Sequence, residues 1–413
     1  MKILMLAWEY PPRSVGGISS HVYDLSHHMA KMGHTVYVMT CNDNTLKEFE
    51  EDDGVYVYRV CPYNIATNNF IDWVFHLNMA ALERAAQLLN DGLDIDIIHV
   101  HDWLMAFCGR ALKHIYAKPL IATIHASEYG RNNGLHSDMQ RYISDVEWWL
   151  TYEAWRVICC SNYMKDELRF VFQLPEDKIR ILPNGVDIEQ LSADGDISDF
   201  RLRYAAPGQR IICFVGRLVR EKGVDTLIAA APAVLSKHPD VKFVIAGNGP
   251  YEDVLRRMTW DRGLYEKVQF AGYVDKQTRN KLYKASDIAV FPSLYEPFGI
   301  VALEAMAARV PVVVSDVGGL SEIVVDGIDG YKVPPGNAQA LADGILSLLD
   351  NPSMASRMCQ KAFYKVQQAY NWDMIASATI KVYTEVLHGN ELADHRNGRS
   401  AKTPISSLQR GYI

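Results

Sequence analysis

The amino-acid sequence predicts an α/β protein with two Rossmann-like, doubly wound parallel-sheet domains that face each other. Three observations carry this prediction. The chain has 413 residues, too many for one ordinary hydrophobic core. Apolar runs of strand length alternate with longer helical stretches, which is typical of parallel sheets covered by helices on both faces. The same alternation then starts again after a loop-rich segment near the middle of the chain.

The first half contains five short apolar runs that read as buried strands, with amphipathic stretches of helical length among them. The expected strands cover residues 3–7, 36–40, 97–100, 120–124 and 157–160. The expected helices cover residues 20–32, 73–89 and 161–171.

The second half repeats this pattern after a joint at 183–208 that is rich in turn residues. Its expected strands cover 211–215, 242–246, 268–270, 288–291 and 312–315, and its expected helices cover 224–237, 251–262, 276–285 and 300–308. We therefore expect an N-terminal domain over 1–190, a C-terminal domain over 191–370, a helix over 371–388 that returns to the first domain, and a disordered tail over 389–413.

Composition narrows the functional class. Apolar residues make up 49% of the chain and charged residues 22%, as in soluble globular proteins. The net charge of -7 argues against nucleic acid as the main partner, because binding to phosphate backbones needs a positive surface. No apolar run approaches the roughly 20 residues that cross a bilayer, and the first run is too short for a signal peptide. The seven cysteines show no zinc-type spacing, and an odd number in a long chain suits a reducing compartment. From these observations we expect a cytoplasmic protein without an integral membrane segment.

Two adjacent glycines follow the first predicted strand, in the sequence Ser14-Val-Gly-Gly17. Gly16 and Gly17 allow a ligand to approach the backbone, and the helix that follows offers free N–H groups and the positive end of its dipole. This arrangement suits a phosphate or a sugar, and a plain tight turn is an equal alternative. The Gly-x-Gly-x-x-Gly dinucleotide fingerprint is absent here, which argues against a dehydrogenase.

A cationic loop, Gly216-Arg-Leu-Val-Arg-Glu-Lys-Gly223, directly follows the first strand of the second half. Ligands bind at the carboxyl ends of strands in parallel sheets. The planar guanidinium of Arg217 and the point charge of Lys222 suit phosphate oxygens, whereas a solvated basic loop is the alternative. Gly247 and Gly249 follow the next strand. They are interpreted either as one wall of a nucleotide pocket or as a structural turn, and the sequence does not favour one over the other.

The strongest motif is Tyr295-Glu-Pro-Phe-Gly-Ile-Val-Ala-Leu-Glu304, which links a predicted strand to a predicted helix. The helix start near Gly299 can offer N–H groups to a diphosphate. Glu296 on the loop and Glu304 in the helix flank this anion site, and carboxylates accept hydrogen bonds from the hydroxyls of a sugar or ribose. Two glutamates in such a segment are usually surface charge, but the intervening Pro-Phe-Gly sequence favours a binding site.

His125 and Asp102 end two neighbouring strands of the first half, so we expect both at the mouth of the cleft. A lone histidine more often makes a structural hydrogen bond, but this position favours a functional role. Trp148, Trp149 and Tyr152 fall at helical spacing and are interpreted as packing, with stacking against an acceptor sugar as the minor alternative.

Together these features resemble the retaining glycosyltransferases of the GT-B fold (group 1, family four), which include bacterial and archaeal glycogen synthases, sucrose synthases and mannosyltransferases. The resemblance covers the whole chain except the tail. Its most specific parts are the two glutamates separated by seven residues at Glu296 and Glu304, the Gly-Arg-Leu…Lys-Gly sequence from Gly216 to Gly223, and the Pro-Asn-Gly-Val-Asp sequence at 183–187.

The resemblance implies a role for each matching residue. Arg217 and Lys222 neutralise the donor diphosphate and the leaving nucleotide, and Glu304 binds the ribose hydroxyls. Glu296 and His125 contact the donor sugar, and transfer proceeds with retention and without a metal or other cofactor. The other residues assigned to the donor site are Gly16, Gly17, Asp102, Gly247, Gly249, Tyr273, Val274, Gly299, Ile300 and Val301.

Within this family, the sequences Ala7-Trp-Glu-Tyr-Pro-Pro12 and His99-Val-His-Asp-Trp103 look most like the glycogen-synthase branch. This implies transfer of glucose from ADP-glucose or UDP-glucose to the end of an α-1,4-glucan. Arg13 departs from the lysine usual in that branch, so a small sugar, a lipid or a cell-surface glycan is the alternative acceptor. A sugar-nucleotide epimerase or hydrolase, or a non-catalytic sensor of sugar nucleotides, is the alternative from another class.

Overall fold

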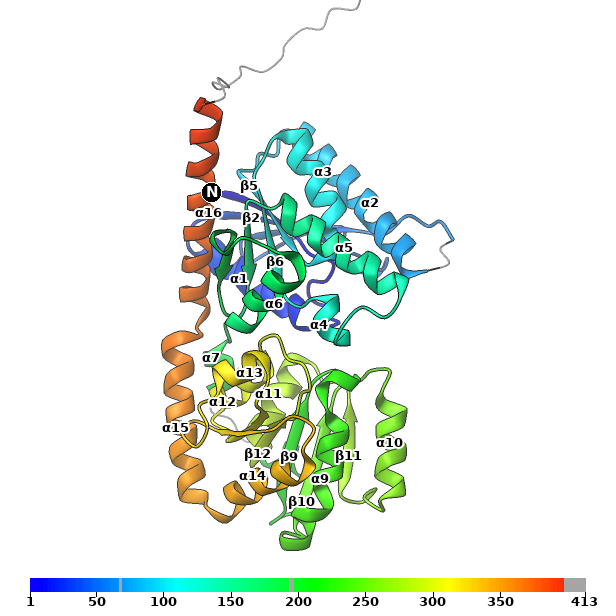
Figure 1. Cartoon of the computed structure of the whole chain (residues 1–413), viewed down its shortest axis with the longest axis vertical. Coiled ribbons are helices and arrows are strands. Elements are labelled where there is room, and N and C mark those ends of the chain that lie inside the picture. The colour runs from blue at the N-terminus through cyan, green and yellow to red at the C-terminus, as the bar shows by residue number, and fades with distance from the viewer. Residues whose placement is uncertain (67–68, 193–196, 397–413) are drawn as a thin grey trace, which may run out of the picture.

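The computed structural model describes residues 1–66, 69–192 and 197–396, and it contains two separate sheets with helices packed on both faces (Figure 1). The predicted pair of α/β domains is therefore confirmed. The two units lie one above the other in Figure 1, with the loops that carry the sequence motifs between them.

The first sheet has eight strands in the order β3-β4-β2-β1-β5-β6-β7-β8. All neighbours are parallel except β3 and β4, which form an antiparallel hairpin at one edge. Its strands are β1 (Lys2–Leu6), β2 (Thr35–Cys41), β3 (Phe49–Asp52), β4 (Val55–Val60), β5 (Ile97–His101), β6 (Leu120–Ile124), β7 (Arg156–Cys159) and β8 (Ile179–Ile181).

The second sheet has six parallel strands in the order β11-β10-β9-β12-β13-β14. Its strands are β9 (Arg210–Val215), β10 (Val241–Ala246), β11 (Val268–Gly272), β12 (Ile288–Phe291), β13 (Val312–Ser315) and β14 (Tyr331–Val333). In both sheets the first strand of the set is central and the chain extends the sheet first to one side and then to the other. The resulting switch points lie at β1/β5 and β9/β12, and a ligand crevice forms outside the carboxyl ends of strands at such points.

Helices cover both sheets. Those of the first domain are α1 (Gly17–Lys31), α2 (Phe70–Asn90), α3 (Ala106–Tyr116), α4 (Glu128–Asn132), α5 (Asp138–Glu153) and α6 (Asn162–Phe172). The connecting segment holds α7 (Ile188–Ser192) and α8 (Ser198–Arg201). Those of the second domain are α9 (Val224–Lys237), α10 (Glu252–Asp261), α11 (Lys276–Ala285), α12 (Ile300–Ala307), α13 (Gly318–Ile323), α14 (Ala338–Asp350) and α15 (Pro352–Ala369).

Four strands were not among those expected from the sequence, namely β3, β4, β8 and β14. They lie at or next to the outer edges of the two sheets. β4 alternates buried and half-buried side chains along most of its length, and β8 and β14 have only three residues each. Continuous apolar runs identify strands that are buried on both faces, so edge strands escape this criterion.

The chain returns to the first domain through α16 (Trp372–Arg396). Trp372, Ile375 and Tyr383 lie in the same apolar cluster as Ile3 of β1, and Figure 1 shows α16 along the side of the upper domain. The helix continues past residue 389, where a disordered tail was expected, because one glycine costs a helix interior only about 1 kcal/mol. The remainder of the expected tail, 397–413, lies outside the described residues. None of the described helices is long and apolar enough to cross a membrane.

Candidate donor-sugar site

The residues predicted for the site follow strands at or next to the switch points of both sheets. In the first domain, Gly17 begins α1 after β1, Asp102 follows β5 and His125 follows β6. In the second domain, the loops after β9 and β12 carry Lys222 and Glu296. The carboxyl ends of the two sheets face each other, and therefore both sets of loops border one interdomain site (Figure 1).

Lys222 and Glu296 form a direct ion pair, which joins two motifs that are 74 residues apart in the chain. The Lys222 Nζ donates to Oε2 of Glu296 at 2.7 Å, and the Ser293 hydroxyl donates to the same oxygen at 3.1 Å. The side chain of Glu296 is only 9% exposed, whereas that of Lys222 is 21% exposed. The lysine charge is therefore positioned and partly accessible to a ligand.

Arg217 lies in the same loop with a more open environment. Its side chain is 46% exposed and lies 3.5 Å from the Glu221 carboxylate. Burial raises the pKa of Glu9 in the first domain, and the charge of Arg217 is close enough to oppose this shift. Arg217 is thus a cation at the interdomain boundary with few fixed partners, which is suited to meet an incoming diphosphate.

The loops that hold these cations depend on glycines at points of close backbone approach. Gly247 has φ 136°, and a Cβ there would lie 1.8 Å from the Gly216 carbonyl oxygen. A Cβ on Gly249 would lie 2.3 Å from the Leu218 oxygen. Both glycines thus have a packing role that supports the Arg217 loop, and their assignment as a pocket wall stays a prediction.

The start of α12 combines a strained turn with unpaired amides. Gly299 has φ 109° and precedes Ile300 and Val301, the first two helical residues, whose N–H groups have no partner within the helix. Gly17 of the first domain meets this point, because a Cβ on Gly17 would lie 3.4 Å from Cδ1 of Ile300. Two of the predicted anion-binding elements therefore come together across the cleft.

Glu304 is buried and already has two partners from α11. Arg279 Nη1 lies 2.8 Å from Oε1, and the Tyr283 hydroxyl donates to Oε2 at 3.2 Å. Burial raises the pKa of Glu304, and the charge of Arg279 opposes this shift. The sequence analysis did not identify Arg279 or Tyr283, although their spacing of four residues on a polar helix placed them on one face.

In the first domain, Asp102 orients the predicted catalytic histidine. Asp102 has φ 57°, a backbone conformation that is rare outside glycine, and its Oδ1 accepts a hydrogen bond from the His125 backbone N–H at 2.7 Å. Burial raises the pKa of Asp102 to about 6, against the effect of Arg131 at 3.8 Å. The strained backbone and the buried carboxyl group thereby fix the loop that presents His125.

His125 itself is neutral. Burial, with the nearby Arg131 charge, lowers the pKa of its imidazole to about 3. Its Nε2 lies 3.2 Å from Nδ1 of His101, and its ring meets that of His21 edge-on at a centroid distance of 4.7 Å. The position of His21 in this cluster was not predictable from the sequence, because His21 is the fifth residue of α1 and is distant in the chain from His101 and His125.

Glu9 is a further buried carboxylate that the sequence analysis missed. Its Oε2 accepts hydrogen bonds from the backbone N–H groups of Val15 and Gly16, the latter at 3.0 Å. The Gly16 amide is therefore engaged by a protein anion, and its predicted contact with the donor stays a prediction. The Glu-Tyr-Pro-Pro sequence before the Gly-Gly turn indicated that this segment is of interest. It did not predict a role for Glu9.

Tyr273 and Val274 lie directly after β11, at the edge of the second sheet. The Tyr273 side chain is 61% exposed, and Val274 packs partly against the core. Their assignment to the donor site stays a prediction.

The two domains are in direct contact around the site. The Ser161 hydroxyl donates to the Pro297 carbonyl at 2.6 Å, and the Tyr295 hydroxyl donates to Glu167 at 3.0 Å. The Glu322 carboxylate accepts from the first backbone N–H groups of α6, at 3.0 and 2.8 Å. A side chain of the second domain thus caps a helix of the first domain, which favours a closed arrangement.

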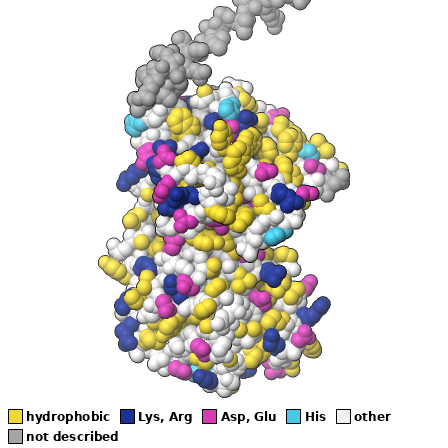
Figure 2. Space-filling model, in the orientation of Figure 1, with side chains coloured by type: hydrophobic (Ala, Val, Ile, Leu, Met, Phe, Trp, Pro, Cys, Tyr) yellow, Lys and Arg dark blue, Asp and Glu magenta, His cyan; other side chains and the backbone are white. Residues whose placement is uncertain are grey.

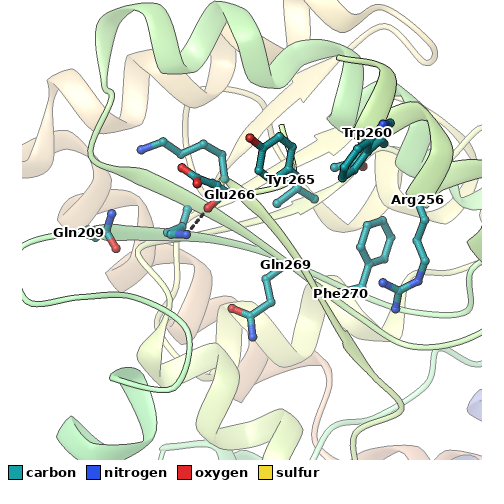
Figure 3. Close-up of a pocket in the computed structure, with 11 residues that line it drawn as sticks. Gln209, Arg256, Trp260, Tyr265, Glu266, Gln269 and Phe270 are labelled. Atoms are coloured by element: carbon teal, nitrogen blue, oxygen red, sulfur yellow. Dashed lines mark hydrogen bonds between the residues drawn. The ribbon is translucent and has the colours of Figure 1, made fainter. Parts of the chain in front are cut away.

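Two surface features lie away from this site. Trp148 and Tyr152 were interpreted as packing residues, but they stack on each other at 5.5 Å and are 45% and 64% exposed, because they project from the outer face of α5. Figure 2 shows apolar side chains gathered over α3 and α5. A hollow of about 740 Å³ lies at the β11 edge of the second domain. Trp260, Tyr265 and Phe270 are among its lining residues (Figure 3).

Comparison with known proteins identifies the family. The Glycosyltransferase Family 4 profile matches residues 15–190, and the Glycosyl transferases group 1 profile matches residues 198–365. An uncharacterized glycosyltransferase of Methanocaldococcus jannaschii is 41% identical over 389 residues, which are 93% of this chain and 98% of that protein. The glycogen synthase of Mycobacterium tuberculosis H37Rv is 35% identical over 403 residues, which are 94% of this chain and 96% of that protein.

A solved structure agrees with this result. Sucrose-phosphate synthase from Thermosynechococcus elongatus superposes with a TM-score of 0.82 at 25% identity, and the match covers 94% of this chain and 99% of that chain. The fold, the paired motifs at the interdomain site and the relatives lead to one conclusion: the chain belongs to the group 1 glycosyltransferases and has the GT-B fold.

Proposed function

We propose that the protein transfers glucose from a nucleoside diphosphate donor, ADP-glucose or UDP-glucose, to the end of an α-1,4-glucan, with retention of the anomeric configuration. The observation that carries this proposal is the combination of Lys222, Arg217 and the α12 start on one side of the site with neutral His125 on the other. The similarity to the M. tuberculosis glycogen synthase over nearly the whole chain supports the glucan as acceptor.

The cations are the source of catalysis in this proposal. When the bond from the sugar to the diphosphate breaks, negative charge develops on the leaving phosphate. Lys222 is already held at 2.7 Å from Glu296, so it does not need to reorganise to meet that charge. Preorganised donors of this kind typically contribute about 10²- to 10³-fold in rate each. Arg217 and the first amides of α12 supply the remaining stabilisation, and the proposed reaction needs no metal.

His125 contacts the sugar in this proposal. The neutral imidazole has one donor and one acceptor nitrogen, which suits a sugar hydroxyl better than a charged imidazolium would. Because its pKa is lowered to about 3, the ring stays neutral at physiological pH. The contacts between the domains exclude water from the reacting carbon and so suppress hydrolysis of the donor.

We place the reaction in the cytoplasm. All seven cysteines are free thiols and six of them are buried, as suits a reducing compartment.

A screen of donors against acceptors tests the proposal. Purified protein is incubated with ADP-glucose, UDP-glucose or other sugar nucleotides, with and without glycogen, and released nucleotide is measured. We expect release that depends on glycogen, and digestion of the product by an α-specific glucosidase reports retention. Release without any acceptor would indicate a hydrolase, conversion of the donor sugar would indicate an epimerase, and binding without turnover would indicate a sensor. Release only with a small sugar, lipid or cell-surface glycan would replace the glucan as acceptor.

A further inference from the structure

Three histidines from separate elements meet at the inner wall of the first domain. His21 comes from α1, His101 ends β5 and His125 follows β6. One ring nitrogen of each lies within 4.8 Å of those of the other two. The ring centroids of His21 lie 5.4 Å from His101 and 4.7 Å from His125. The cluster therefore brings one nitrogen from each of three rings within 4.8 Å of the others.

The hydrogen bonds of this cluster are incomplete. Among the described residues, Nε2 of His101 and both ring nitrogens of His21 lack a hydrogen bond of ordinary geometry, although the Asn184 side chain lies close to His21. Both residues are more than nine-tenths buried. A buried polar atom without a partner costs about 1–3 kcal/mol. Burial also lowers the pKa of all three imidazoles, so that they are in the neutral form that coordinates metal ions.

The distances are compatible with coordination after a small adjustment. Zinc–nitrogen bonds of about 2.0–2.1 Å in a tetrahedral site place two ligand nitrogens about 3.4 Å apart. His101 Nδ1 and His125 Nε2 already lie 3.2 Å apart, as a hydrogen-bonded pair that a metal ion would replace. The remaining separations, at most 4.8 Å, close with ring rotation and shifts of about one ångström.

His99 shows what a purely structural histidine looks like in the same region. Its Nε2 pairs with the Thr123 hydroxyl at 2.7 Å and its Nδ1 pairs with the Tyr383 hydroxyl at 2.6 Å. Both of its nitrogens are used, and its ring packs in a tilted arrangement against that of His101 at a centroid distance of 4.1 Å. His99 therefore has a structural role, whereas His21 and Nε2 of His101 lack such hydrogen bonds.

We propose that His21, His101 and His125 bind one divalent transition-metal ion of the class that prefers imidazole ligands, such as Zn²⁺ or Co²⁺. Of the three ligands, His125 alone is partly exposed, so an ion and a fourth ligand would reach the cluster from the side of His125. A bound ion occupies the imidazole that contacts the donor sugar and therefore inhibits transfer. This consequence, unlike the binding itself, rests on the proposed function.

Metal binding is measured without any substrate. The full-length wild-type protein, freed of metal by a chelator that is then removed, is titrated with Co²⁺. The visible ligand-field absorption and equilibrium dialysis report affinity and stoichiometry. We expect one ion per chain. His21→Gln and His101→Gln each remove one ligand and should weaken binding at least about tenfold, the lower range for loss of a supporting group at such sites.

His28→Gln is the matched control, because it changes the same residue type two turns along α1, where the ring pairs with Asp373 at 2.7 Å. We expect it to leave Co²⁺ affinity unchanged. X-ray absorption of the Zn²⁺-loaded wild-type protein gives a second measurement that needs no variant, and three imidazole ligands are expected. A wild-type protein that binds less than one Co²⁺, an unchanged affinity in His21→Gln, or a spectrum without three imidazoles would overturn the site. Binding without inhibition would leave the metal site in place and overturn the donor contact of His125.

Discussion

The replacement of Lys222 by methionine separates the catalytic from the structural role of one side chain. Methionine keeps most of the apolar stem and removes the ammonium group that lies 2.7 Å from Glu296. The glutamate is then left with the Ser293 hydroxyl at 3.1 Å as the partner of its buried Oε2. Breaking a fully buried ion pair costs about 3–5 kcal/mol. Because Lys222 is 21% exposed and water can enter, we expect the lower part of that range, about 3 kcal/mol.

This loss has two measurable consequences. For a domain of 150–250 residues, each kcal/mol lowers the melting temperature by roughly 2–4 °C, so a drop of about 6–12 °C is expected in thermal unfolding. Loss of the charge from the leaving phosphate should lower kcat by about 10²- to 10³-fold in the nucleotide-release assay. Arg220→Met is the control, since it removes an exposed cation from the same turn and should change both quantities little.

A double variant separates the two effects. Lys222→Met combined with Glu296→Gln no longer buries an unpaired charge, and it should recover most of the lost stability. It should not recover turnover, because the charge that stabilises the leaving group is still missing. Turnover of Lys222→Met within about threefold of the wild type, with the protein folded, would refute the assignment of Lys222 to the diphosphate.

Further outcomes follow from other parts of the site. Glu304→Gln removes a charged acceptor and should weaken donor binding in calorimetry by about 10- to 100-fold, so unchanged affinity would count against a ribose contact. Gly247→Ala places a Cβ 1.8 Å from the Gly216 oxygen and should lower the melting temperature, and an unaltered thermogram would argue against the close approach. The pKa of each buried histidine of the cluster is lowered, so the unfolded chain takes up protons near pH 6.5 while the folded chain does not. Stability should thus be full above about pH 6.5 and fall on acidification toward pH 3, by up to about 1.4 kcal/mol per pH unit for each group, and a flat profile in thermal unfolding would contradict this. EDTA should not lower turnover, and a loss of activity that Zn²⁺ restores would show that a metal assists the reaction.

The fold was predictable because its signal is local. A parallel strand that is buried on both faces, such as β12, is apolar along its whole length, and such a run is visible in the sequence itself. Edge strands such as β8 and β14 need not be apolar along their length, so they were not predicted. The short helix α4 depends on a local cap, in which the Ser127 hydroxyl accepts a hydrogen bond from the Gly130 N–H. Helix α16 extends beyond its expected end at residue 388, because a single glycine, Gly389, does not by itself end a helix.

The location of the candidate site residues was predictable in part. Arg217, Lys222 and Glu296 follow strand ends, and the topology of a parallel sheet brings strand ends together. Their partners were not predictable, because contacts such as Arg279 with Glu304 depend on which helix faces form when the domain packs. The engagement of the Gly16 amide by Glu9 likewise depends on how the loop folds back.

The sequence by itself determined that this chain has two doubly wound domains and that its candidate site residues lie near strand ends, because hydrophobic periodicity and loop composition are properties of neighbouring residues. Only the tertiary structure decided that Lys222 pairs with Glu296, that Gly17 meets Ile300 across the cleft, and that His21 joins His101 and His125. These residues are brought together by the packing of separate elements and of two domains, and burial in that packing lowers the pKa of His125.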